Sequence, residues 1–557
     1  MRQQGGMTPS AKLMAAAALL VMLVAVFAIV PTRAAILSQL WGLNQVYFAE
    51  FQRKLAARTA PDLDEPLFKA ASVAEAPVPT AKYGGGRYDG PISVSLDSKD
   101  AITYTLDGSI PTRQSAVYRD PLPINTTTAL RFRAFRDGLH PSPVVTHTYV
   151  IALDTKLPVV SVVMDPVDLW NRYTGIYDNP EEKGSEWQRA AHIEHLPVQG
   201  SGDVIQFPAE IRIHGQTSRS RPKKSFRFTY ESKLIEPQSA TSLWHPRPGE
   251  PTRTVVLRTG GAYRLRNELF QTLFAEVGGI GSPATLYLML LNGEVWGLYN
   301  IHEYIDESFL VRHVAPGQYD LIPDGGDGAA VAGDKKAWKE FETFYKTHDA
   351  SREGDFRRFG ELIDLDNFTD YWLFNVYAAN FDWPHHNTLA FRDRTGADRR
   401  WRWISWDVDA AFDFDRQGLR HDTAAWALRN ELRHDLRFNH HKGLQDQEEF
   451  VAGTLLMRQL VKNAAFRERL ASRMCHLLET TLRPSHAEGV LNNLVRETGS
   501  GLPLDLTRWS IAPKAYWDEV GAIRRFVRER PDLVRSYLGR AFGLPPQHCS
   551  RPHADPK

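Results

Sequence analysis

Apolar and polar residues alternate in short runs between residues 83 and 151. A period of two places one face of each run in a core and the other in solvent, which predicts β-strands. Asp107-Gly108 and Asp137-Gly138 occur where turns are needed, and glycine adopts positive φ angles without a steric cost. The alternating runs cover residues 92–96, 102–106, 129–135 and 144–150. Four strands in a segment of this size predict a small β-sandwich.

Runs of consecutive apolar residues begin at Leu157 and indicate buried strands. Two of these runs, 286–291 and 295–301, flank Asn292-Gly293, which predicts a hairpin. Apolar residues at helical spacing occur over 266–277, 338–345, 368–379, 515–526 and 531–542. Strands that precede most of the helices predict an α+β domain with a strand-rich front half.

An uninterrupted apolar run from Leu13 to Val30 is long enough to cross a bilayer as a helix. It exceeds the usual core of a signal peptide, and residues 33–35 make a poor cleavage site, so we expect an uncleaved signal-anchor. A cleaved secreted form is the alternative. Arg2 and Lys12 precede the run, which places the N-terminus in the cytoplasm and the body on the exported side.

The expected organisation has five parts. They are a cytoplasmic stub with the anchor (1–35), a juxtamembrane helix and linker (36–82), the β-sandwich (83–151), the α+β domain (157–545) and a tail (546–557). A length of 557 residues allows two or three domains. A net charge of +1 argues against a dedicated nucleic-acid binder. With two cysteines, Cys475 and Cys549, the chain has no cysteine zinc cluster; one disulfide and two unpaired thiols both remain open.

Acidic and amide side chains stand among aromatic rings in residues 375–387 and 401–415. Such groups are costly to hold beside apolar rings unless a partner such as a metal compensates them. Asp382 and Asn387 have the order Asp-x-x-x-x-Asn, and Asp407 and Asp409 follow at the end of an expected strand. Protein kinases use parts in this order, namely a base, a metal-binding Asn and a later metal-binding Asp.

A basic turn lies upstream of these acids. It begins at Gly215 and contains Arg219, Lys223 and Lys224, and its amides and lysines have the chemistry to bind phosphate. Glu303 follows an apolar strand and is able to pair with one of the lysines. A basic surface loop explains the turn equally well, and for Glu303 taken alone a solvated charge at a strand end is the favoured interpretation. Spacing does not show which lysine faces a site, because neighbours on a strand point to opposite sides.

Three further groups are less specific. For Pro384-His385-His386 we favour a helix end over a zinc pair, because adjacent side chains point apart. For Asp413 and Asp415 a solvated turn is favoured over a second metal site. The Gly325-Gly-Asp-Gly stretch lacks the strand and helix of a P-loop, so we interpret it as a loop.

Several dispersed motifs resemble the CotH family of spore-coat protein H-type atypical protein kinases. They are Thr174-Gly-Ile-Tyr177, Arg212-Ile-His-Gly-Gln-Thr-Ser-Arg219 with Pro-Lys-Lys-Ser-Phe, Asn292-Gly-Glu-Val-Trp-Gly-Leu-Tyr-Asn-Ile-His-Glu303, Asn380-Phe-Asp-Trp-Pro-His-His-Asn387 and Trp406-Asp-Val-Asp409. The resemblance implies a divergent kinase-like fold that binds ATP with Mg2+ and phosphorylates proteins on serine or threonine.

Carried over by motif, the resemblance makes Asp382 the base and Asn387 with Asp407 the metal ligands, and Asp409 is able to exchange roles with Asp407. Lys223 or Lys224 would contact phosphate. Glu303 would support that lysine, and Arg219 belongs to the same nucleotide-binding group.

Residues 83–151 resemble the β-sandwich module at the C-terminus of chitobiases and hexosaminidases. The match rests on 104–112, Tyr118, 127–134, Ser142 and Thr148-Tyr149. This module carries no catalytic residues, so it implies a spacer, which we favour, or a binder of cell-wall glycan.

We therefore expect a membrane-anchored, exported kinase that transfers the γ-phosphoryl group of ATP to a protein hydroxyl. A non-catalytic envelope protein with a kinase-like shell is the main alternative. Metal-assisted hydrolysis of glycans by the same carboxylates is a third interpretation.

Overall fold

The computed structural model describes residues 74–198, 201–231, 252–259, 262–326, 328–384, 386–429 and 453–543, which belong to one compact unit. The predicted anchor at 13–30 and Cys549 lie outside the described residues. Within the described part, no helix is both long and apolar enough to cross a membrane. Cys475 is buried and disulfide-bonded.

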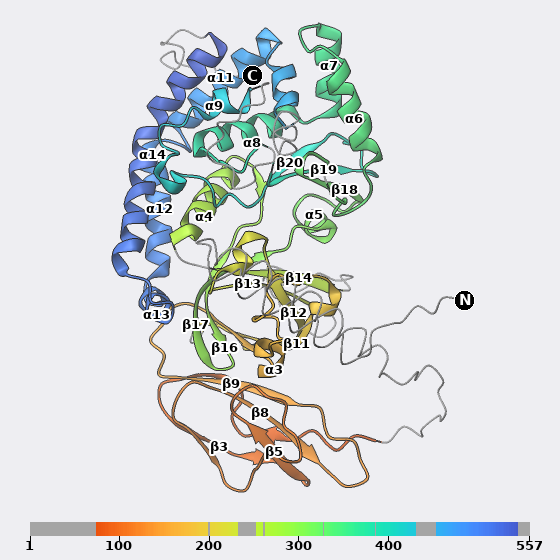
Figure 1. Ribbon diagram of the computed structural model, residues 1–557, viewed down its shortest axis with the longest axis vertical. Helices are drawn as coiled ribbons and strands as arrows, with labels where there is room; N and C mark the ends of the chain where they lie inside the picture. The colour runs from red at the N-terminus through yellow and green to blue at the C-terminus, as the bar shows by residue number, and fades with distance from the viewer. Residues whose placement is uncertain are drawn as a thin grey trace, which may run out of the picture. The chain divides into compact units, whose positions relative to one another are not determined.

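Residues 80–151 form a β-sandwich-like module, as the alternation predicted (Figure 1). Its main sheet has the strand order β2-β9-β8-β5-β6, and the pairs β3–β7 and β1–β4 complete it. In β8, Leu130, Phe132 and Ala134 are buried, while Arg131 and Arg133 lie on the half-exposed face. The strands are β1 (Thr80–Ala81), β2 (Gly86–Tyr88), β3 (Ile92–Val94), β4 (Leu96–Asp97), β5 (Ala101–Thr105), β6 (Ala116–Val117), β7 (Leu122–Ile124), β8 (Thr128–Phe135) and β9 (Val145–Ile151).

A closed barrel follows the sandwich, with strand order β10-β11-β12-β13-β14-β17-β16. Strands β10 and β16 pair in parallel and the other neighbours are antiparallel. Asn292 and Gly293 have φ angles of 50° and 85° and form the predicted hairpin turn between β16 and β17. The strands are β10 (Val159–Val163), β11 (Arg189–Leu196), β12 (Ile205–His214), β13 (Ser225–Glu231), β14 (Thr252–Thr259), β16 (Thr285–Leu291) and β17 (Glu294–Glu303).

The rest of the described chain is mainly helical and contains one small sheet, so the α+β prediction is confirmed. The sheet has the order β15-β20-β19-β18. Its strands are β15 (Ile280–Gly281), β18 (Tyr319–Pro323), β19 (Thr388–Asp393) and β20 (Arg402–Ser405). The principal helices are α4 (Ala262–Ala275), α5 (Glu307–His313), α6 (Lys336–Thr347), α7 (Glu353–Leu362), α8 (Leu365–Ala378), α9 (Thr423–Ala427), α11 (Ala464–Glu479), α12 (Pro484–Thr498), α13 (Gly501–Arg508) and α14 (Pro513–Phe542).

Helix α14 corrects one sequence interpretation. The helices predicted at 515–526 and 531–542 are a single helix that contains Pro531. Proline removes one backbone hydrogen bond and usually ends or bends a helix. Here Val527 and Val534, one turn before and one turn after the proline region, are both fully buried, and this apolar packing holds the helix together.

The sandwich packs directly on the barrel within this compact unit. The carboxylate of Glu194 in β11 is fully buried and accepts hydrogen bonds from the backbone N–H (3.0 Å) and the hydroxyl of Thr148 in β9. A side chain at Gly293 would come within 2.8 Å of the backbone nitrogen of Ala129 in β8. The small module is therefore fastened to the barrel by buried polar contacts and by close backbone approach.

Candidate functional site

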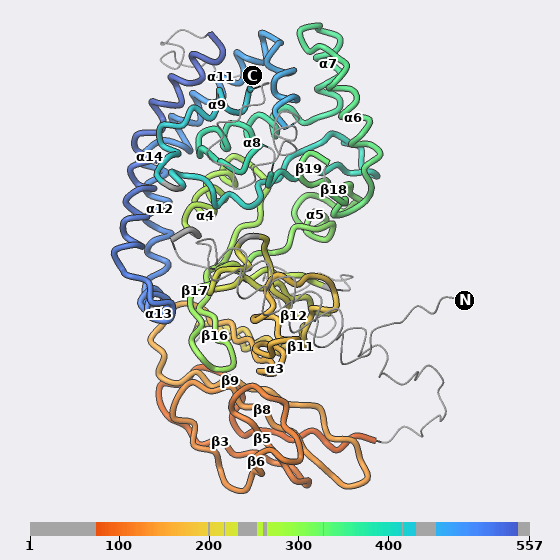
Figure 2. The backbone as a smooth tube through the Cα atoms, in the orientation of Figure 1, coloured from red at the N-terminus to blue at the C-terminus, as the bar shows by residue number. Residues whose placement is uncertain are grey.

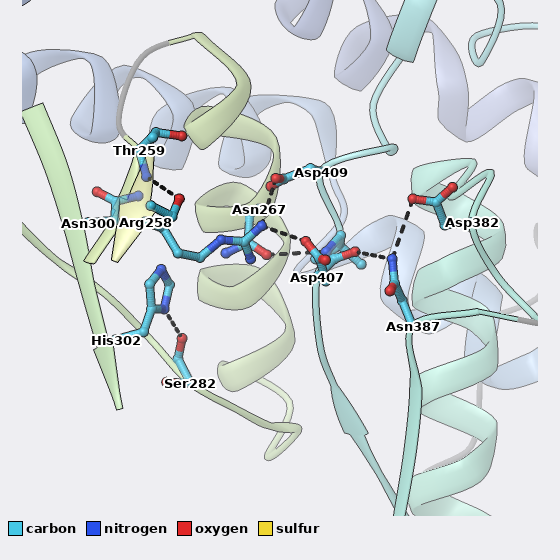
Figure 3. Close-up of polar contacts among 12 residues, drawn as sticks. Arg258, Thr259, Asn267, Ser282, Asn300, His302, Asp382, Asn387, Asp407 and Asp409 are labelled. Atoms are coloured by element: carbon cyan, nitrogen blue, oxygen red, sulfur yellow. Dashed lines mark hydrogen bonds and ion pairs between the residues drawn. The ribbon is translucent and has the colours of Figure 1, made fainter. Parts of the chain in front are cut away.

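The first part of the site is the loop between α8 and β19, which carries Asp382 and Asn387. Helix α8 ends at Ala379 in the left-handed conformation, so the chain turns sharply before the loop. The backbone N–H of Asp382 donates to Oδ1 of Asn380 at 3.3 Å. Asn387 has a φ angle of 54°, a conformation that Asn tolerates better than most residues. Its amide donates to Oδ2 of Asp382 at 3.4 Å, so the predicted base and amide meet (Figure 3).

The second part is the segment after β20, which carries Asp407 and Asp409. The same amide nitrogen of Asn387 donates to the backbone carbonyl of Asp407 at 3.1 Å. Asp407 also has a positive φ angle, 50°. The structure thus brings together the four acidic and amide residues that the sequence singled out, in the arrangement shown in Figure 3.

Arg258 at the end of β14 is the cation of the site. Its Nη2 atom donates to Oδ1 of Asp407 at 2.5 Å and to Oδ2 of Asp409 at 2.7 Å (Figure 3). Burial lowers the pKa of Arg258, but the charges of Asp407 and Asp409 raise it by more. Desolvation, with further negative potential from Asp407 and Glu268, raises the pKa of Asp409 although Arg258 opposes this. The carboxylates and guanidinium form one tightly coupled group.

A network of polar side chains on α4 and β17 lies next to Arg258 and the two aspartates. Oε1 of Glu268 accepts hydrogen bonds from Asn267 at 3.0 Å and from Asn300 at 2.9 Å. It also lies 3.3 Å from Nε2 of His302. The other amide atom of Asn267, Oδ1, accepts from the backbone N–H of Val408 at 3.2 Å, which ties α4 to the Asp407–Asp409 segment. Helix α4 therefore positions the acids as well as supplying a third carboxylate nearby.

Arg530 of α14 makes hydrogen bonds to the chain on both sides of the site, before Asp382 and after Asp409. Its guanidinium, which is completely buried, donates to the carbonyls of Val376 and Tyr377 near the end of α8 at 2.9 Å each. It also donates to the carbonyls of Leu419 at 2.9 Å and His421 at 2.7 Å, in the segment after the acids. One side chain thus joins the helix before Asp382 to the chain after Asp409.

The oxygen-rich group fits a hard divalent ion. Mg2+ prefers carboxylate and amide oxygens, and those of Asp407 and Asp409 already converge on a single cationic nitrogen. The amide nitrogen of Asn387 makes the hydrogen bonds described above, which leaves its oxygen as the acceptor atom. Among the described residues, no group of three or more His, Cys, Asp or Glu side chains is arranged for metal binding. The fit here rests on two carboxylates and one amide.

The two lysines of the basic turn, one of which was predicted to contact phosphate, donate to other groups of the protein. Nζ of Lys223 donates to Oδ1 of Asp505 in α13 at 2.5 Å and to the carbonyl of Leu298 in β17 at 2.9 Å. Helix α13 lies beside β17, as Figures 1 and 2 show. Nζ of Lys224 donates to the carbonyls of Arg219 at 2.8 Å and Arg221 at 3.0 Å. Both ammonium groups are committed to structural contacts.

Arg219 also serves the fold of the turn. Its buried guanidinium donates to the carbonyls of Gly215 at 2.6 Å, Ile213 at 2.7 Å, Pro180 at 2.6 Å and Glu182 at 3.1 Å. These contacts anchor the turn to the preceding strand and to the chain near 180. The basic residues predicted to bind nucleotide therefore hold the turn in shape.

Glu303, predicted to support one of the lysines, is paired with residues of α5 and β14. It accepts from Nε of Arg312 at 3.2 Å, contacts Nε2 of His313 at 2.7 Å and is also paired with Arg253. Burial opposes ionisation, but the hydrogen bond from His313 and the two arginine charges lower the pKa of Glu303 to about 2. This carboxylate joins α5 to β14 and β17.

Asp413 is not a solvated turn residue. It is fully buried, and its Oδ1 accepts from the backbone N–H of Leu419 at 3.0 Å. Its Oδ2 lies 3.3 Å from Arg525 of α14. His385 and the side chain of Asp415 lie outside the described part of the chain. Gly325 belongs to a short turn whose carbonyl accepts from Trp338 at 2.8 Å, consistent with a loop.

Sequence reasoning missed Arg258, Glu268, Asn267 and His302. One sequence feature could have pointed to this part of the site. Arg258 is a charged residue at the end of the apolar run 255–257, just before an amphipathic helix. Burial, together with the positive charge of Arg258, lowers the pKa of His214 at the end of β12 to about 4. These residues come from four elements, β12, β14, α4 and β17, that meet only in the folded chain.

The sequence matches two family models. Residues 211–534 match the family described as CotH kinase protein, and residues 83–146 match the chitobiase/β-hexosaminidase C-terminal domain. The chain is 21% identical over 291 residues to inner spore coat protein H of Bacillus subtilis strain 168, a match that covers 48% of this chain and 72% of that protein. The crystal structure of the Helicobacter pylori proinflammatory kinase CtkA matches with 9% identity and a TM-score of 0.19, over 46% of this chain and 91% of that one.

Proposed function

This chain belongs to the CotH kinase protein family, and from that premise we propose that it transfers the γ-phosphoryl group of ATP to serine or threonine hydroxyls of exported or envelope proteins. The observation that carries the proposal is the hydrogen bonding of one amide, that of Asn387, to Asp382 and to the backbone of Asp407. A base and metal-binding groups in contact are what phosphoryl transfer needs.

Asp382 is the group proposed to accept the proton of the acceptor hydroxyl. A base must lie within hydrogen-bond reach of the proton it removes, so its orientation matters. Asn387 donates to Oδ2 of Asp382, and the backbone N–H of Asp382 donates to Asn380, so both ends of the residue are held. The carboxylate is thereby directed by the loop before a substrate arrives.

Asn387, Asp407 and Asp409 would hold Mg2+ through their side-chain oxygens. The ion, when bound, neutralises the charge that develops on the phosphates during transfer. Side chains of the described residues supply the remaining charges at the site. Arg258, and neither Lys223 nor Lys224, is the cation in contact with the acids, so it takes the phosphate-binding role in our proposal.

We further propose that the main body acts on the exported side, held by a membrane anchor at 13–30. In this proposal the module at 83–151 is a spacer between anchor and kinase domain, or a binder of cell-wall glycan. Its similarity to the chitobiase C-terminal domain supports such a role. Loss of binding to purified wall polysaccharide after deletion of 83–151 would separate glycan binding from a spacer role.

The test is transfer of radiolabelled phosphate from ATP by the purified full-length chain. Asp382→Asn and Asp407→Asn should lower transfer by about 100-fold or more. Asp398→Asn is the matched control, because Asp398 is also a partly exposed aspartate paired with arginines, but it contacts Arg400 and Arg402. A folded wild-type chain that binds no Mg2+–ATP in calorimetry would overturn the proposal. Cells in which the Asp382 and Asp407 variants retain full function would favour a non-catalytic envelope protein instead.

A further inference from the structure

Arg258 occupies the place where a divalent ion would bind to Asp407 and Asp409. Its Nη2 atom is 2.5 Å from one carboxylate and 2.7 Å from the other. The side chains of Asp407 and Asp409 are 37% and 43% exposed, whereas that of Arg258 is 20% exposed. Part of each carboxylate therefore remains exposed, and the cation that joins them comes from the protein side.

A metal ion and this guanidinium would compete for the same two oxygens. Oδ1 of Asp407 and Oδ2 of Asp409 converge on Nη2 of Arg258. Carboxylate oxygens are the ligands that Mg2+ prefers. A divalent ion held by these two oxygens would take the place of that nitrogen, because two cations so close together repel each other. Metal binding through this pair of oxygens would therefore require Arg258 to move.

The structure contains a second anionic partner for Arg258. Glu268 of α4 contributes to the negative potential at Arg258, and it is held by Asn267 and Asn300. Asn300 is also the residue that pairs with Arg258 across β14 and β17. A guanidinium that leaves the aspartates therefore stays beside a fixed carboxylate and at the edge of the same site.

We propose that Arg258 is a resident counter-cation of the Asp407–Asp409 pair, which the divalent ion displaces so that the guanidinium turns toward Glu268 and the phosphates of the nucleotide. This inference rests on the proposed function, because it assumes that the two aspartates bind metal. It adds a specific competition between a side chain and the metal, and assigns Arg258 opposite effects on two ligands. In the nucleotide-free chain it weakens metal binding, and in the metal-loaded chain it strengthens nucleotide binding.

The experiment titrates Mn2+ alone into the full-length chain, followed by electron paramagnetic resonance of the free ion. Arg258→Gln should bind Mn2+ on the order of tenfold more tightly than wild type, a typical coupling between two competing sites. At saturating Mn2+ the same variant should bind ATP about tenfold more weakly. Arg392→Gln is the matched control, since Arg392 is 24% exposed and pairs with Asp320 at 3.0 Å. Its two affinities should equal those of wild type.

The outcomes separate this inference from the proposed function. If Arg258→Gln binds Mn2+ with wild-type affinity while Asp407→Asn loses it, the competition is disproved and the metal site stands. If Arg258→Gln binds both Mn2+ and ATP more weakly, Arg258 is structural and the inference is overturned. If neither wild type nor Arg258→Gln binds Mn2+, with or without ATP, the metal roles of the aspartates fail, and the proposed function fails with them.

Discussion

Asn387 donates a hydrogen bond from its side-chain amide to the backbone carbonyl of Asp407 at 3.1 Å. Both residues have positive φ angles, 54° and 50°. Each therefore lies at a sharp turn, one just before β19 and the other shortly after β20. The hydrogen bond fixes these turns to each other, and the same amide reaches Asp382. Asp382 and the Asp407 segment are thus coupled through one side chain.

Replacement of Asn387 should separate conformational strain from site geometry. Asn387→Ala is expected to lower the free energy of unfolding by about 1–2 kcal/mol, because alanine is strained at positive φ. It should also lower phosphoryl transfer on the order of 100-fold through misplacement of Asp382. Asn387→Gly tolerates the φ angle, so it should lose activity with a smaller loss of stability. Urea unfolding and the phosphate-transfer assay measure the two effects, and an active glycine variant would contradict the coupling.

Asp382→Asn tests the proposed base. The isosteric amide keeps the loop but cannot accept the hydroxyl proton, so kcat should fall by about 10²–10⁴-fold. The affinity for Mg2+–ATP, measured by calorimetry, should remain that of wild type because other residues are proposed to hold the metal. A variant with weakened nucleotide binding and unchanged kcat would instead make Asp382 a ligand.

Lys223→Met tests the structural assignment of the basic turn. Lys223 and Asp505 form a largely buried ion pair, with side-chain exposures of 12% and 1%. Removal of one partner leaves a buried charge, so the free energy of unfolding should fall by about 3–5 kcal/mol. The double variant Lys223→Met with Asp505→Asn removes the buried charge but keeps an acceptor for the backbone N–H of Leu298, so it should recover much of this loss. Folded Lys223→Met should retain wild-type kcat, and a selective loss of kcat would return Lys223 to the active site.

Glu194 predicts a pH dependence of stability. Burial raises its pKa to about 7, against an ordinary value of 4.5, despite the hydrogen bonds from Thr148. Between these two values the folded chain keeps a proton that the unfolded chain releases. The contribution to stability is therefore complete below pH 4.5 and is lost as pH rises through 7.

The size of this loss is about 3 kcal/mol, from about 1.4 kcal/mol for each pKa unit. Glu194→Gln, which does not titrate, should remove that part of the pH dependence. Urea unfolding of both chains at pH 5 and pH 8 measures it. Equal pH dependence of the two chains would show that Glu194 is ionised throughout this range. Because Glu194 contacts the sandwich, limited proteolysis at the two pH values would report whether that module loosens first.

Local chemistry was predictable from the sequence, whereas contacts between distant segments were not. The Asn292-Gly293 hairpin and the Asp382–Asn387 loop each lie within one short segment, so turn residues and spacing were sufficient to predict them. Arg258 and Asp407 are 149 residues apart, and no periodic pattern links them. The sequence left open whether Lys223 or Lys224 faces a site. The position of the Lys223 ammonium group depends on its ion pair with Asp505, which is 282 residues away in the sequence.

The completely buried Arg530 has a consequence for how the chain matures. It binds the carbonyl of Tyr377, 153 residues earlier, and those of Leu419 and His421. Newly made chain emerges from its N-terminus, so the loops with Asp382 and Asp407 appear well before helix α14. They lack the hydrogen bonds of Arg530 until residue 530 has left the ribosome. The assembled site therefore belongs to the finished chain.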